Sequence, residues 1–391
     1  MLRSLYSGIS GLRAHQTMLD VTGNNIANVN TTAFKASATQ FQDTLSQLSQ
    51  GAAAPTDGSG GSNPAQVGLG VQVAGIATNF AQGSSQTTGK ASDMLISGDG
   101  FFVTQEGGET VYSRAGSFDF DSAGRLVTPS GAIVQGWGAV DGVVNEGGAI
   151  GDLSLPVDTV IAGDVTTSAI MGGNLPSDAA SGTSLVRDIK VYDASGAART
   201  VSLTFTSTGA GGWNVAAADG AAGDTTTLAF TDGKLTTTGA SLSVNGIDID
   251  LSALTGLAGL STASVTSQNG SAPGSLESYS FGPDGTLVGL FSNGEQKALG
   301  RIALATFSNP GGLEKTGSNG YRATFNSGTA ELGAPGSTGL GSLTGGALEM
   351  SNVDLSQEFT NLIVAQRGFQ ANARIITTSD EVLQELTNLK R

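Results

Sequence analysis

Residues 355–391 of this chain read LSQEFTNLIVAQRGFQANARIITTSDEVLQELTNLKR. Large apolar side chains recur there at every seventh position, at Leu355, Leu362, Phe369, Ile376 and Leu383. Phe359 and Ala373 fall on a second row, which Gln366 and Asp380 interrupt. A repeat of this period predicts a helix that packs lengthwise against another helix, as in a coiled coil. A helix of about 35 residues would be about 50 Å long, which is long for a globular domain.

The start of the chain shows the same period. Apolar residues seven apart stand at Leu5, Leu12, Leu19 and Ile26. Ile9 falls on the second row, which Gln16 and Gly23 then weaken. Glycine in a helix interior costs about 1 kcal/mol, so Gly8 and Gly11 are best tolerated where another backbone comes close. The sequence therefore predicts that both ends of the chain pack together as a coiled-coil-like helical domain.

Two interpretations of this helical pair remain open. Because its apolar rows are interrupted, an isolated pair would be marginally stable, and contacts with neighbouring copies would stabilise it. We therefore expect the ends to be poorly ordered in a free monomer and to fold on assembly. The alternative is a self-contained helical hairpin that caps a β protein.

The middle of the chain changes to a period of two, which is typical of strands. Residues 201–206 alternate between apolar and hydroxyl side chains, and residues 242–251 alternate around Asn245-Gly246, a strong hairpin signal. Further turn pairs follow at Asp232-Gly233, Asn293-Gly294 and Asn319-Gly320. The expected fold is mainly β, with many short antiparallel strands between long terminal helices.

Glycine-rich stretches at residues 51–63 and about 328–346 read as linkers on both sides of the β body. The resulting division has four parts. We expect a terminal helical assembly domain (1–35 and 350–391), a linker or extended region (36–70 and 328–349), a core β domain (71–144 and 273–327) and an inserted outer β domain (145–272).

Composition excludes several classes of function. The 391 residues carry a net charge of −15, concentrated in the middle of the chain, so nucleic-acid binding is not expected. The absence of cysteine removes disulfides, thiolate nucleophiles and cysteine-ligated metals. We see neither the apolar run of a cleavable signal peptide nor a stretch long enough for a membrane helix, so no membrane insertion is expected.

Two segments resemble a known family. Residues 19–35, LDVTGNNIANVNTTAFK, resemble the amino-terminal signature of bacterial flagellar rod and hook proteins, although Ala33 replaces a glycine that is usual there. Residues 348–374 resemble the second signature of that family. The matching positions on which we rely are Asn24, Asn25, Asn28, Asn30, Phe34, Ser351, Asn352, Val353, Asp354, Gln366 and Arg367. Residues 98–118 and 304–313 resemble the core β domain of the family.

This resemblance implies a structural protein that polymerises with copies of itself into a tube. The length of the chain and the segment 145–272 favour the hook members, whose tube is a flexible universal joint that passes motor torque to the filament. A distal rod protein is the alternative. The implied partners are rod, hook-cap and hook–filament junction proteins and the export apparatus. The implied location is outside the cell, reached without signal cleavage. The assembly interface would comprise Leu5, Ile9, Leu12, Leu19, Ile26, Leu355, Phe359, Leu362, Phe369, Ile376 and Leu383.

Chemical alternatives have little support in the sequence. His15 is the single histidine, and without a second histidine or a cysteine we interpret it as an interface or solvated side chain. Asp119 and Asp121 are two apart on an expected strand, but a glycosidase-like pair needs a second, distant carboxylate. A secreted β-rich adhesin would not need matched heptads at both ends, and a β-helical lyase would need regular repeats. We expect no enzyme, no cofactor and no metal.

Overall fold

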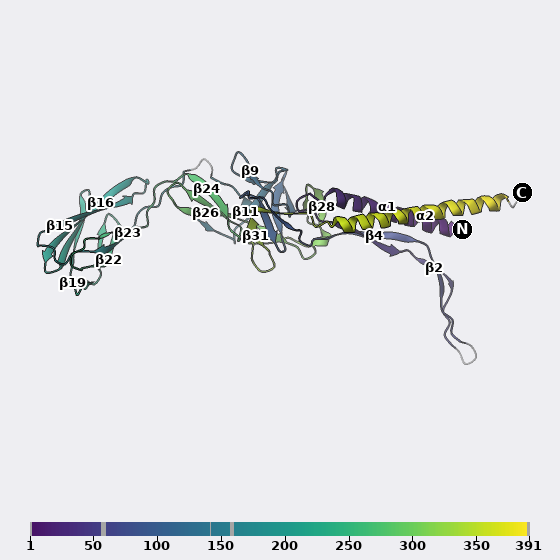
Figure 1. The fold of residues 1–391 in the computed structure, drawn as a ribbon, viewed down its shortest axis with the longest axis horizontal. Helices are drawn as coiled ribbons and strands as arrows, with labels where there is room; N and C mark the ends of the chain where they lie inside the picture. Colours follow the sequence, from purple (N-terminus) through teal and green to yellow (C-terminus); the bar gives the residue numbers. More distant parts are fainter. Residues whose placement is uncertain (1, 56–59, 141, 157–159, 389–391) are drawn as a thin grey trace. The chain divides into compact units, whose positions relative to one another are not determined.

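The computed structural model describes residues 2–55, 60–140, 142–156 and 160–388 (Figure 1). The chain forms two compact units. The first unit comprises Met1–Leu155, Ser280–Val288 and Ala298–Arg391, and the second comprises Pro156–Tyr279 and Gly289–Lys297. The chain thus leaves and re-enters the first unit, whose beginning and end are the two termini.

Two long helices lie side by side in the first unit (Figure 1). Helix α1 is Leu2–Ala27 and helix α2 is Leu355–Asn388. They run antiparallel, because Gly8 lies beside Ile375 and His15 lies beside Gly368. Asp354 caps α2: its Oδ1 accepts the backbone N–H of Ser356 at 2.8 Å, one of the donors that a helix start leaves unpaired. The prediction of paired terminal helices is confirmed.

Next to α1 lies a short antiparallel sheet of β1 (Ser37–Asp43) and β4 (Val71–Thr78). Between these strands the chain forms a second pair, β2 (Ser46–Gln50) with β3 (Ala65–Gly68), whose residues are all exposed. Residues 51–63, which the sequence marks as glycine-rich, connect β2 to β3, and residues 56–59 among them lie outside the described part.

The large sheet of the first unit contains the path β11-β7-β8-β29-β28 and collects strands from both halves of the sequence. Aromatic side chains form its core: the rings of Tyr112 and Phe307 meet edge to face at 4.8 Å, and Phe101 and Trp137 pack in the same cluster. The glycine-rich stretch 328–346 contains β30 and β31, which pair with β27 and β6. The bounds are β5 (Ser85–Thr87), β6 (Met94–Ser97), β7 (Phe101–Glu106), β8 (Glu109–Ser113), β9 (Asp119–Phe120), β10 (Leu126–Val127), β11 (Ile133–Val140), β12 (Val143–Val144), β13 (Gly151–Asp152), β27 (Leu304–Thr306), η1 (Pro310–Gly312), β28 (Glu314–Gly317), β29 (Gly320–Arg322), β30 (Glu331–Gly333), β31 (Ser342–Gly345) and β32 (Ala347–Glu349). Strands β24 (Leu276–Phe281), β25 (Thr286–Phe291) and β26 (Gln296–Ile302) each have residues in both units.

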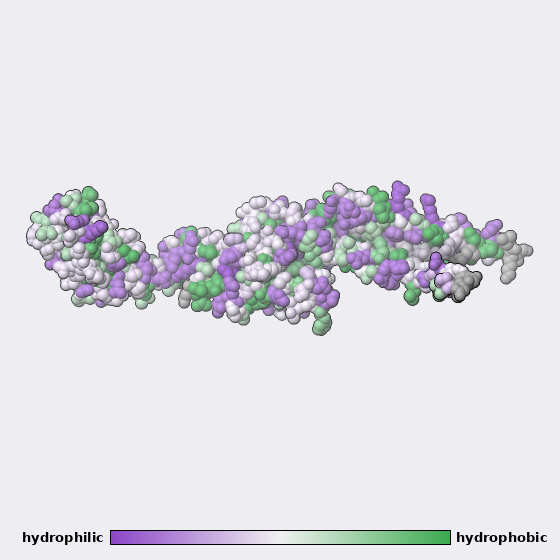
Figure 2. Space-filling view, turned by 90° about the horizontal axis from the view of Figure 1, so that it is seen from below, coloured by the Kyte–Doolittle hydropathy of each residue, from purple (hydrophilic) through white to green (hydrophobic). Residues whose placement is uncertain are grey.

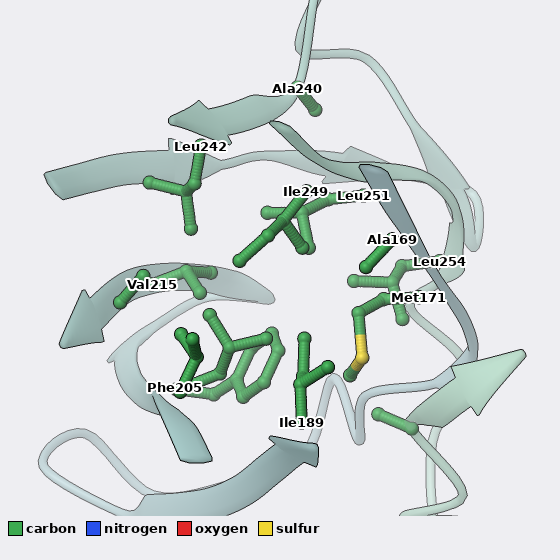
Figure 3. Close-up of a cluster of buried hydrophobic side chains, with 14 of the residues drawn as sticks. Ala169, Met171, Ile189, Phe205, Val215, Ala240, Leu242, Ile249, Leu251 and Leu254 are labelled. Atoms are coloured by element: carbon green, nitrogen blue, oxygen red, sulfur yellow. The ribbon is translucent and has the colours of Figure 1, made fainter. Parts of the chain in front are cut away.

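The second unit packs two sheets around one apolar core. Strands β15 (Ser184–Tyr192), β16 (Ala198–Gly209), β17 (Gly212–Asp219) and β18 (Ala222–Leu228) form an antiparallel meander. The other sheet contains β14 (Ser168–Asn174), β19 (Phe230–Thr231), β20 (Lys234–Leu235), β21 (Ser241–Val244), β22 (Ile247–Thr255) and β23 (Ser264–Gln268). Figure 3 shows Phe205 and Val215 from the meander pointing toward Leu242 and Ile249 from the other sheet. The period-two pattern therefore sorts apolar side chains into this core, as the sequence predicts.

One pairing in the second unit differs from the expectation of antiparallel strands. Asn245 and Gly246 both have positive φ, at 51° and 80°, and form the predicted hairpin turn between β21 and β22. Strand β14, however, pairs with β22 in parallel. A parallel pair needs a long connection, and the meander β15–β18 lies in the chain between these two strands.

Candidate assembly site

The predicted interface residues fall into two groups on the helices. Half-buried residues are Leu5, Leu12, Leu19, Ile26, Leu362, Phe369, Ile376 and Leu383, whereas Ile9, Leu355 and Phe359 are 37%, 40% and 52% exposed. The second buried row lies three residues after the first and not four. It contains Gly8 and Thr22 on α1 and Ala365 on α2, all of them buried. The apolar residues four positions on are therefore left at the surface.

Glycines on each helix make room for side chains of the other helix. A Cβ atom on Gly11 would lie 2.7 Å from Oδ1 of Asn372, and one on Gly368 would lie 2.5 Å from the ring of His15. Real Cβ contacts are wider, so the side chains of Asn372 and His15 can occupy these places only because Gly11 and Gly368 lack side chains. Gly23 has open space around it and takes no part in this contact. Such small residues are invisible to a search for apolar heptads.

His15 lies in this close contact. Its ring packs on Gly368 and is tilted against the ring of Phe41 at a centroid distance of 5.9 Å. Nδ1 is buried without a hydrogen-bond partner in the described part of the chain. The described residues contain no group of three His, Cys, Asp or Glu side chains that could hold a metal ion. The position of His15 therefore fits an interface side chain.

Apolar side chains remain exposed along both edges of α2. Leu355, Phe359 and Ile363 follow one edge, and the other edge, here called the distal stripe, consists of Val364, Ile375, Val382 and Leu386. Each of these side chains is between 40% and 53% exposed. Figure 2 shows hydrophobic residues at the surface of the helical region, with hydrophilic residues between them. Exposed apolar patches on a soluble protein mark interaction sites, and two such stripes on one helix indicate contacts with other molecules.

The two family signatures, far apart in the sequence, meet in a polar junction. Nζ of Lys35 donates to Oε1 of Glu349 at 2.6 Å and to the carbonyl of Ala81 at 2.9 Å. Both charged side chains are almost fully buried. The backbone N–H of Gly83 donates to the same carboxylate oxygen at 2.8 Å, and the guanidinium of Arg114 lies 3.7 Å from the other. A buried carboxylate needs such partners, so the junction holds both ends of the chain in one place.

Burial lowers the pKa of the Lys35 ammonium, and the hydrogen bond and charge of Glu349 oppose that effect. The neighbouring Arg114 adds a smaller repulsion in the same direction as burial. Loss of the carboxylate would remove the interactions that favour the charged amine at this site. Lys35 and Glu349 therefore form a structural ion pair, in which each charged side chain needs the other to remain charged while buried.

Asn352 completes the junction from the second signature. Its Oδ1 accepts the N–H of Ala36 at 2.8 Å, and its Nδ2 donates to the carbonyls of Asn79 and Ala81 at 2.8 and 3.0 Å. Asn25 exchanges two hydrogen bonds with the backbone of Ser37 in the same way. A side-chain amide offers a separate N–H donor and carbonyl acceptor to the backbone at the same time, which explains the asparagines at these two positions.

The remaining signature residues lie near the turn between α1 and β1, directly before α2, or on α2. Nδ2 of Asn28 donates to the carbonyl of Asn24 at 2.9 Å. Ala33 has a φ of 57°, a conformation that explains why glycine is usual there, and its N–H donates to the carbonyl of Glu349 at 2.7 Å. Phe34 is buried, Ser351 and Val353 are half-buried, Asn30 and Asp354 are exposed, and Gln366 and Arg367 are exposed on α2.

Lys35, Glu349 and Arg114 are not among the site residues expected from the sequence. The charges of Lys35 and Glu349 give no local signal, because each signature contains further charged residues, such as Asp20 in the first and Asp354 in the second. The pairing of Lys35, Glu349 and Arg114 depends on the fold alone.

Comparisons with known proteins agree with this geometry. Three family models match: "Flagella basal body rod protein" over residues 5–35, "Flagellar hook protein FlgE/F/G D1 domain" over 95–172 and "Flagellar basal body rod FlgEFG protein C-terminal" over 344–389. The first and third matches contain most of α1, all of α2, and Lys35 and Glu349 of the junction. The chain belongs to the family of flagellar hook and rod proteins.

Full-length relatives assign the chain to the hook members of this family. The flagellar hook protein FlgE of Borreliella burgdorferi is 41% identical over the whole of both chains, and that of Escherichia coli is 38% identical over 98% of both. The flagellar basal-body rod protein FlgG of Bacillus subtilis is 35% identical over the whole of both. The homologues show a structural subunit of the flagellar hook, a component of the bacterial flagellum that polymerises. In the described part of the chain, neither helix is long and apolar enough to cross a membrane.

Proposed function

We propose that this chain polymerises into the flexible hook tube that carries torque from the flagellar motor to the filament. The observation that carries the proposal is the position of the exposed apolar stripes. They lie on the helices beyond the Lys35–Glu349 junction, where one chain alone leaves them in water. In a tube, neighbouring copies would cover them, and the marginal helical pair would gain its missing contacts.

The predicted interface positions and domain boundaries belong to the same proposal. The helical domain (1–35 and 350–391) lines the tube, the region 36–70 and 328–349 connects it to the core β domain (71–144 and 273–327), and residues 145–272 form the outer β domain. Serine, threonine and small residues on the exposed strand faces suit weak contacts that can exchange when the tube bends. Subunits reach the tip outside the cell through the export apparatus without cleavage, with the rod, hook-cap and hook–filament junction proteins as neighbours. No catalytic step is required.

Electron microscopy of the purified chain tests the proposal, beside a version that lacks residues 1–30 and 355–391. We expect tubes from the full chain and none from the truncated one. Compact monomers from both, under conditions that include a high concentration of ammonium sulfate to strengthen apolar burial, would contradict the proposal. A truncated chain that keeps its β content by circular dichroism shows that the loss of tubes does not come from misfolding.

A rod subunit is the second candidate, because one full-length relative is a rod protein. The two candidates differ in the shape and mechanics of the polymer. Curved tubes that change curvature with temperature or salt favour the hook, and straight, stiff tubes favour the rod. Restoration of motility to a strain that lacks its hook gene, and not to one that lacks its distal rod gene, decides between them.

A further inference from the structure

Helix α2 is longer than the helix against which it packs. Gly8 lies beside Ile375 and Ile376, and the antiparallel helices advance by about 1.5 Å per residue, so the start of α1 lies near residue 382. The rest of α2, up to Asn388, has no α1 residue beside it. Figure 1 shows α2 running past the beginning of α1. This overhang carries Val382 and Leu386 of the distal stripe, 49% and 48% exposed.

A groove of complementary character lies on the other side of α1. It has a volume of about 410 Å³ and runs between α1 and β4. Its apolar lining comes from Tyr6, Ile9, Ala14, Val71 and Val73, and its one charged lining residue is Arg13. Ser10 holds the groove together, because its Oγ accepts the backbone N–H of Val71 at 3.2 Å. The groove is therefore formed by two elements, α1 and β4, that are held together by a hydrogen bond.

The charges of the overhang and the groove are opposite. Arg13 is exposed and forms no ion pair within the described residues, and neither does Glu385. Glu385 lies three residues after Val382, so it flanks the distal stripe on the helix surface. Glu358 lies three residues after Leu355 and flanks the other apolar stripe in the same way, but Glu358 is half-buried with a buried Oε2, whereas Glu385 is exposed. The exposed carboxylate therefore favours the distal stripe as the occupant of the groove.

The two surfaces cannot meet within one chain. Ile9 in the groove lies beside the turn of α2 near residue 374, so Leu386 is about 18 Å further along the helix. We infer that the α2 overhang of one copy docks into the α1–β4 groove of a second copy, with Glu385 beside the second copy's Arg13. This inference rests on the proposed polymerisation and names the contact that carries it from one subunit to the next. Because the two surfaces are different, the contact is head-to-tail and can continue without closing.

Disulfide cross-linking tests this contact, since the natural chain has no cysteine. The variant Ile9→Cys/Leu386→Cys is polymerised and oxidised, then run on a denaturing gel without reductant. We expect a ladder of dimers and higher multimers, because a disulfide requires Cα atoms within about 7 Å and only the intermolecular pair can satisfy this. The matched control is Ile9→Cys/Phe359→Cys, which places the second cysteine at a similarly exposed position on the other stripe. Each single-cysteine variant shows how much cross-linking arises between the same position on two copies.

The cross-linking experiment gives different outcomes when the docking contact is wrong and when the proposed function is wrong. Tubes without a ladder, or an equal ladder from the Phe359→Cys control, overturn the docking contact and leave the polymer intact. A natural chain that forms no tubes overturns the proposed function, and the contact with it.

Reversal of the charges at Arg13 and Glu385 gives a second test, which measures the critical concentration for polymerisation and needs no cysteines. Arg13→Glu and Glu385→Arg should each raise the critical concentration for polymerisation by about fivefold, and the double variant should return it to within about twofold of the natural chain. A double variant no better than either single variant overturns the inference. The monomers are compared by circular dichroism to show that their folds are unchanged.

Discussion

Removal of the Lys35 amine should destabilise the first unit far more than removal of an exposed amine. The ammonium is buried and bonded to Glu349 at 2.6 Å and to the Ala81 carbonyl. In Lys35→Met the carboxylate stays buried, with only the Gly83 N–H and the more distant Arg114 as partners. Breaking a buried pair in this way costs about 3–5 kcal/mol, and the remaining partners place the expected loss near 3 kcal/mol.

The assay is thermal unfolding of the monomer, followed by calorimetry. For a unit of this size about 3 kcal/mol corresponds to a fall in Tm of roughly 6–12 °C. The control is Lys90→Met, because Lys90 pairs with Asp119 at 3.1 Å while both side chains are largely exposed, so its loss should cost less than about 1 kcal/mol. The double variant Lys35→Met/Glu349→Leu should recover part of the loss, because it removes the unpaired carboxylate, while Arg114 keeps Asp99 as its partner at 3.8 Å. Equal shifts for Lys35→Met and Lys90→Met would refute this account of the junction.

Three further predictions concern other parts of the molecule. The backbone N–H of Arg125 holds the pKa of Asp121 below its ordinary value of 3.8. The ionised carboxylate therefore stabilises the folded protein fully above pH 3.8, and this contribution is lost as the pH falls through the lowered pKa. Asp121→Asn should flatten the fall in the free energy of unfolding below about pH 4, which denaturant titration measures. Phe205→Ala removes a fully buried ring from the core of the second unit and should cost about 3–5 kcal/mol in that unit, while the calorimetric transition of the first unit stays in place. Asn352→Ala leaves the N–H of Ala36 without its acceptor and should cost about 1–3 kcal/mol and slow polymerisation, whereas an unchanged Tm would contradict the role given to this amide.

Repeating patterns in the sequence predicted the parts of the fold that depend on local periodicity. The heptad rows of Leu355–Leu383 and Leu5–Ile26 predicted both helices and their pairing, which the structure confirms. The Asn245-Gly246 turn was equally readable, because two residues with positive φ need that chemistry. Each helix and the turn form within the same stretch of sequence that carries its signal.

Features that depend on distant residues could not be predicted in this way. The second buried row on the helices contains Gly8, Thr22 and Ala365, small residues that leave no pattern of large apolar side chains. Lys35 and Glu349 are separated by 314 positions, and nothing in their local sequence announces their contact. The parallel pairing of β14 with β22 likewise depends on how the intervening meander folds.

The central claim is that the terminal helices carry polymerisation, and electron microscopy of the full chain beside the version without residues 1–30 and 355–391 tests it most directly. The account predicts tubes from the full chain and folded, soluble monomers from the truncated one. Tubes of the same diameter from the truncated chain would contradict it, because the contacts between subunits would then lie in the β units alone.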